Sequence, residues 1–92
     1  MDSMGFIHNI QQKLEPIGPI ILPSIIKKQL QEVGATEYDL TPEQAEELIK
    51  RIEFALERFI GPDGTKMAHK MMLRELRKSA PDYFEKLEWV AK

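Results

Sequence analysis

The chain has 92 residues, with 13 Lys and Arg against 15 Asp and Glu, and it contains no cysteine. This length predicts one small domain, and the lack of cysteine excludes disulfides, zinc–thiolate sites and thiol catalysis. The net charge of −2 argues against general affinity for nucleic acid, which depends on neutralising phosphates. No apolar run approaches the ~20 residues that span a bilayer, and no secretion signal is recognisable. We therefore expect a cytoplasmic protein.

The pattern from Met1 to Glu15 predicts a first helix. Ile7, Ile10 and Leu14 recur at helical spacing and form its apolar face. Ser3 is a candidate N-cap, because a hydroxyl can accept a hydrogen bond from the first turn. The prediction is an amphipathic helix that buries one side.

Gly18-Pro19 ends the first helix, since Gly-Pro is unfavourable inside a helix and suits a hinge. The second helix is expected either kinked from Pro19 or regular from near Pro23, because the residue before a proline avoids the helical region. Gly34 is the expected C-terminal cap. The apolar run from Ile20 to Ile26 could belong to the core or to an interface.

Thr41-Pro42-Glu43-Gln44 has the pattern of a capping box with proline at the first helical position. It predicts a third helix from Pro42 to about Ile60. The expected apolar stripe of this helix is wide enough for more than one neighbour and contains Leu48, Ile52, Ala55 and Phe59.

Gly61-Pro62-Asp63-Gly64 predicts a second hinge, followed by a fourth helix over residues 65–78. Ser79 to Asp82 again combines a cap with a proline, which predicts a short fifth helix from Pro81 to Ala91. No alternating pattern or two-residue hairpin turn indicates a strand. The fold class expected is therefore all-α, a compact bundle of about five helices in one domain over residues 1–92.

The phrase Ile-Gly-Pro occurs at residues 17–19 and again at residues 60–62. Aligning the two copies places Lys27 on Lys70, Leu30 on Leu73 and Glu32 on Glu75. With one residue inserted upstream, the apolar positions of the first and third helices also match. This predicts a duplicated helix–Gly-Pro–helix hairpin, with copies at about 4–34 and 42–78 and a closing helix at 81–91.

No set of residues predicts catalysis, a cofactor or a metal. His8 and His69 lack the neighbouring carboxylates at ligand spacing that a metal site requires. Asp63-Gly64 lacks the alternating oxygen ligands of a calcium loop and is typical of a turn. We expect no enzyme activity and no small-molecule substrate.

A basic stripe follows the predicted fourth helix. Lys66, Lys70, Arg74 and Arg77 recur at about one-turn spacing, as on a helix that contacts a phosphate backbone. The alternative is a solvated face that complements the Glu-rich third helix. Sequence-specific readout is not expected, because the stripe lacks the Asn or Gln that reads adenine.

Large apolar residues that fall off the inward faces suggest a contact surface instead. Met67 and Met71 lie on the fourth helix beside its inward face, and Phe84 and Trp89 lie off the apolar stripe of the last helix. These four residues are the expected contacts with a protein partner or with a second copy.

Phe59-Ile60-Gly61-Pro62, followed by Met71-Met72-Leu73, resembles the tail modules of some bacterial and archaeal signalling proteins, where a Tyr/Phe-Ile-Gly-Pro phrase opens an apolar–basic helix. The resemblance covers residues 14–33 and 56–76. The chain departs from it in placing Asp63-Gly64 after the proline. The resemblance implies a helical interaction module without catalysis.

Taken together, these features predict a small, cytoplasmic, non-enzymatic protein–protein interaction or oligomerisation module, as a homodimer or a signalling or regulatory adaptor. The alternative is a nucleic-acid-binding protein that uses the basic stripe of residues 65–78. No membrane partner is expected.

Overall fold

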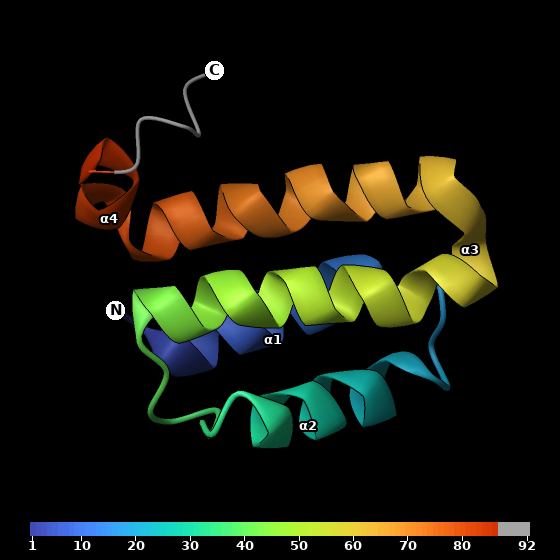
Figure 1. Cartoon of the computed structure of the whole chain (residues 1–92), viewed down its shortest axis with the longest axis horizontal. Coiled ribbons are helices and arrows are strands. Elements are labelled where there is room, and N and C mark those ends of the chain that lie inside the picture. Colours follow the sequence, from blue (N-terminus) through green and yellow to red (C-terminus); the bar gives the residue numbers. More distant parts are fainter. Residues whose placement is uncertain (87–92) are drawn as a thin grey trace.

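The computed structural model describes residues 1–86, which form four α-helices and no strand (Figure 1). The helices are α1 (Ser3–Leu14), α2 (Leu22–Glu32), α3 (Pro42–Ser79) and α4 (Pro81–Lys86). The predicted all-α class is confirmed. The count is four rather than the expected five, because the predicted third and fourth helices are continuous in α3 apart from the non-helical Gly61, which lies in the predicted hinge. None of these helices is long and apolar enough to cross a membrane.

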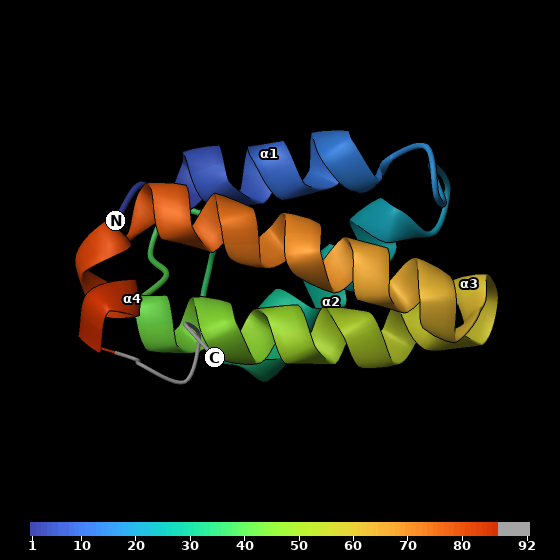
Figure 2. The same cartoon turned by 90° about the horizontal axis from the view of Figure 1, so that it is seen from above.

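A single glycine produces the bend in α3. Gly61 has φ 75° and ψ 177°, a conformation that is essentially confined to glycine. Pro62 then lies in the first turn of the second half of α3, where its missing N–H costs little. The Thr65 hydroxyl donates a hydrogen bond of 2.7 Å to the carbonyl of Gly61. The two halves of α3 consequently run in opposite directions, side by side (Figure 2).

The helices form a bundle around this bent element. α1 and the first half of α3 run in the same direction, and the second half of α3 lies across one side of them (Figures 1 and 2). α2 packs on the opposite side. Both Gly-Pro turns lie at one end of the bundle, and α4 lies at the other end together with the start of α1.

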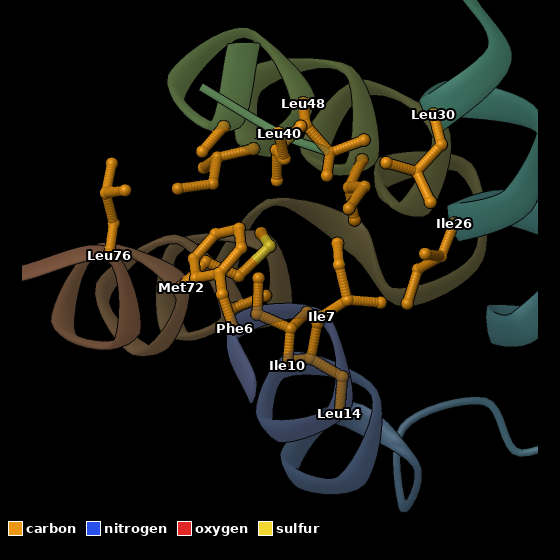
Figure 3. Close-up of a cluster of buried hydrophobic side chains, with 14 of the residues drawn as sticks. Phe6, Ile7, Ile10, Leu14, Ile26, Leu30, Leu40, Leu48, Met72 and Leu76 are labelled. Atoms are coloured by element: carbon orange, nitrogen blue, oxygen red, sulfur yellow. The ribbon is translucent and has the colours of Figure 1, made fainter. Parts of the chain in front are cut away.

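The core lies between all three long helices, and side chains from each converge on it (Figure 3). Phe6 of α1 and Met72 of α3 are fully buried and point toward one another. The other buried apolar side chains are Ile7, Ile10, Leu14, Leu22, Ile26, Leu30, Leu40, Ala45, Leu48, Ile49, Ile52, Leu56, Ala68, Leu76 and Ala80. The apolar run from 20 to 26 is divided: Leu22 and Ile26 belong to this core, whereas Ile20 is 87% exposed.

The helix ends follow the sequence in α2 and α3 but differ in α1. Thr41 and Gln44 form the expected capping box at the start of α3. Gly34 adopts φ 73° just after α2, which begins as a regular helix at Leu22. The N-cap of α1 is Asp2, so the prediction of Ser3 was wrong.

Ser3 has a different role, in which it links the start of α1 to the segment that precedes α3. Its hydroxyl donates to the carbonyl of Leu40 and accepts from the Leu40 N–H, at 3.1 and 3.0 Å. Both groups are buried, so this pair satisfies backbone atoms that water cannot reach.

Candidate interaction surface

Two surface hollows lie along the groove between α2 and the first half of α3. Two adjoining hollows of about 560 and 380 Å³ share the side chains of Lys28, Gln29 and Phe54. We call this the α2/α3 groove; its remaining lining residues are Ser24, Ile25, Glu32, Glu47, Lys50, Arg51, Ala55, Arg58 and Phe59. It is an open surface groove and not an enclosed cavity, which suits a polypeptide better than a small molecule.

Two phenylalanine rings stand in this groove. Phe54 is 70% exposed and Phe59 is 63% exposed. Phe59 was expected on the inward stripe of the third helix, and that prediction was wrong. The stripe holds for Leu48 and Ile52, which are fully buried, but Phe59 lies in the last turn before the bend.

Charged side chains surround the rings. Lys50 pairs with Glu46 at 3.9 Å, and Arg51 pairs with Glu47 at 3.3 Å, each one turn apart along α3. Exposed pairs of this kind contribute only about 0.3–0.5 kcal/mol each. The charges around the groove can therefore exchange partners at small cost.

The basic stripe is also exposed. Lys66, Lys70, Arg74 and Arg77 all lie at the surface of the second half of α3, and we call them the cationic face. α1 and residues 65–79 of α3 together carry six of the 13 Lys and Arg residues but only one of the 15 acidic residues, Glu75. The rest of the sequence carries the other seven basic residues and 14 acidic residues.

Glu75 is a buried acidic residue on the second half of α3. Its carboxylate accepts from Lys13 at 2.5 Å and lies 3.5 Å from Lys78. Burial by itself raises the pKa of this carboxyl, but the hydrogen bond and charge of Lys13, aided by Lys78 and Asn9, hold the pKa below its ordinary value. Glu75 is therefore ionised at neutral pH and joins α1 to α3.

The four apolar residues predicted to contact a partner differ in how far the structure exposes them. Met67 is 69% exposed, whereas Met71 is half-buried against the core. Trp89 lies outside the described residues, and so does the side chain of Phe84. The structure therefore does not bring these four residues together as one described surface.

The histidines are not near a set of metal-binding groups. His8 is exposed on α1, and His69 pairs through Nδ1 with Glu53, which joins the two halves of α3. Over residues 1–86, no three His, Asp or Glu side chains are grouped as a metal ion would require.

Comparison of the chain with protein-family models, with curated proteins and with solved structures gives no match. The site therefore has to be judged on its own geometry.

The α2/α3 groove was not predicted from the sequence, although one signal was present. Phe54 falls outside the expected apolar stripe of the third helix, and an aromatic residue on the polar side of a helix marks a surface that is not used for folding.

Proposed function

We propose that this chain is a small cytoplasmic, non-enzymatic module for protein–protein interaction or self-association, built from a duplicated helix–Gly-Pro–helix hairpin. The observation that carries the proposal is the exposure of Phe54 and Phe59 in the α2/α3 groove. Burying such a ring stabilises a complex by about 1.5–3 kcal/mol, and neither ring contributes much to the core of the described fold.

The surroundings of the rings support the same function. Interfaces commonly combine aromatic anchors with arginine and a polar rim, and the α2/α3 groove places Arg51 and Arg58 beside Phe54. The resemblance of residues 14–33 and 56–76 to helical tail modules of signalling proteins points in the same direction. Homodimers and regulatory adaptors are the two forms that we consider.

The first experiment measures solution mass by light scattering over a concentration series, together with retention of proteins from a cell extract on the immobilised chain. The test variant is Phe54→Ser with Phe59→Ser, and the matched control is Ile20→Ser with Tyr38→Ser, which removes two large side chains that are exposed elsewhere on the surface. We expect only the phenylalanine variant to lose association. Two results together would overturn the proposal: a wild-type chain that does not self-associate, and a phenylalanine variant that retains every protein that the wild-type chain retains.

Nucleic-acid binding is the second candidate, and the charge imbalance favours it. The cationic face supplies four of the six basic residues in α1 and residues 65–79. The single acidic residue of these two segments, Glu75, is buried. Four phosphate contacts predict a salt dependence of log K on log[salt] with a slope of about −3.6. Lys70→Glu with Arg74→Glu should abolish the shift of a duplex probe at low salt, whereas Lys27→Glu with Lys28→Glu should not. No shift with wild-type protein removes this candidate.

A further inference from the structure

The outward side of the first half of α3 is a continuous exposed surface centred on one aromatic ring. We call it the Phe54 face, and it comprises Glu47, Lys50, Phe54, Glu57 and Arg58, all exposed. These positions are three, four or seven residues apart, so they lie on the side of the helix away from the buried Ile52 and Leu56. Figure 2 shows this part of α3 along one edge of the bundle, with α2 partly hidden behind it, so the face borders the α2/α3 groove.

The charges on this face are arranged in two rows. At 100° per residue, Glu47 and Arg58 fall on one side of Phe54, and Lys50 and Glu57 fall on the other. Each row contains one acid and one base. The face therefore has no net charge, in contrast to the cationic face on the second half of α3.

Such rows match themselves when a helix meets an identical helix in the antiparallel direction. A two-fold axis perpendicular to both helices makes each row face its own copy, with reversed direction. An axis that passes close to Phe54 then sets Glu47 opposite Arg58 of the second copy, and Lys50 opposite Glu57. The two pairings need axis positions that differ by only one residue, about 1.5 Å along the helix.

We propose that the Phe54 face binds the same face of a second copy of this chain, as an antiparallel two-fold dimer with the two Phe54 rings at its centre. This inference rests on the proposed function and names its partner. A neutral face with alternating charges is suited to a copy of itself more than to a uniformly acidic protein or to nucleic acid. The intrahelical pairs of Lys50 and Glu47 are exposed, so exchanging them for pairs across the dimer costs little.

Charge reversal tests the geometry through two variants that should complement each other. Arg58→Glu places like charges opposite Glu47 at both symmetric contacts, and Glu47→Arg does the same opposite Arg58. We expect either variant alone to raise the dimer dissociation constant about tenfold or more. In an equimolar mixture every Glu–Arg pair is restored across the heterodimer, so dimers should form again at the wild-type concentration.

Analytical ultracentrifugation of each variant and of the mixture provides the measurement, with Arg74→Glu on the cationic face as the matched control. Recovery in the mixture also shows that both variants are folded. A wild-type chain that stays monomeric at millimolar concentration overturns this inference, and so does a dimer that neither reversal weakens or that the mixture fails to restore. The proposed function survives those results if the phenylalanine variant still loses a protein from the extract.

Discussion

The chain reverses direction at two Ile-Gly-Pro phrases, and the two reversals are built differently. Between α1 and α2 the change of direction takes seven residues, 15–21, and Gly18 does not adopt a positive φ. In α3 the change of direction occurs at Gly61, and the helix resumes at once. The phrase is therefore compatible with both a seven-residue connection and a one-residue bend.

The residues after each phrase account for the difference. In the first copy a Cβ on Gly18 would lie 2.8 Å from Cγ1 of Ile21, so the isoleucine packs over the first glycine. In the second copy the position equivalent to Ile21 is Gly64, and Ile60 packs over it with contacts of 3.1–3.2 Å to a Cβ placed there. A glycine at position 64 thus allows the second half of α3 to begin directly after the bend.

The helices before and after the first turn have buried residues at nearly the same positions as the two halves of α3. Buried residues recur 42 positions apart in the pairs Phe6 and Leu48, Ile7 and Ile49, Ile10 and Ile52, Leu14 and Leu56, Ile26 and Ala68, and Leu30 and Met72. The Ile-Gly-Pro phrases are 43 positions apart, so the core and the turns follow spacings that differ by one residue. The duplicated hairpin remains a prediction, and the following three tests address it.

The largest effect is expected in the core pair Leu14 and Leu56, which are both fully buried. Leu14→Ala and Leu56→Ala should each lower the free energy of unfolding by about 2–5 kcal/mol, because each leaves a cavity. If the two positions are equivalent, the two losses agree within about 1 kcal/mol in urea denaturation. Ile20→Ala, at an exposed site, serves as the control and should change stability by less than about 0.5 kcal/mol.

The two glycines should respond unequally. Gly61→Ala forces a side chain into a conformation reserved for glycine and should cost about 1–3 kcal/mol. Gly18→Ala requires only a shift of the half-buried Ile21 side chain, and the reduced entropy of the unfolded chain offsets part of that cost, so the change should stay within about 1 kcal/mol. Thermal unfolding followed by circular dichroism compares them, and equal losses would contradict the difference between the turns.

The smallest change in stability is expected for two glutamates, Glu32 and Glu75, which align when the two Ile-Gly-Pro phrases are superposed. Glu75 is buried against Lys13, whereas Glu32 is exposed. At pH 7, Glu75→Gln should cost about 1 kcal/mol, because Lys13 is partly solvated, and Glu32→Gln should cost less than half of that.

The pH dependence of that difference has a defined sign. The pKa of Glu75 is lower in the folded protein than its ordinary value of 4.5, so its stabilising contribution is complete above that pH and is lost as the pH falls through the folded pKa. Denaturation at pH 7, 5 and 3 should show wild type and Glu75→Gln converging in acid. An unchanged gap at pH 3 would show that the ion pair is not its source.

Local signals in the sequence were sufficient for much of the fold. The capping box at Thr41 and the glycine after α2 depend on neighbouring residues only, and both were predicted. Ser3 was misassigned because Asp2, one residue earlier, is also a capping residue, and the contact of Ser3 with Leu40 spans 37 positions of the chain. Pairing at that distance leaves no periodic pattern in the sequence.

The site was less predictable than the fold. Which face of the third helix remains uncovered depends on how α2 packs beside it, and that is a tertiary property of the whole bundle. Phe59 has the helical spacing of a core residue but lies in the last turn before the bend and remains exposed. Exposure of the basic stripe, by contrast, was predictable, because Lys66 and Arg74 are rarely buried residue types.

Pro62 has a further consequence for how copies of the chain can exchange parts. Without the bend, α3 would be a straight helix of 38 residues, about 57 Å long, in a molecule whose longest dimension is 33 Å. Two such opened chains would pack the second half of α3 of each onto the α1 of the other, forming a domain-swapped dimer. Pro62 opposes this exchange, because a proline within a continuous helix costs about 3 kcal/mol. Glycine thus permits the closed hairpin, and proline penalises its intertwined alternative.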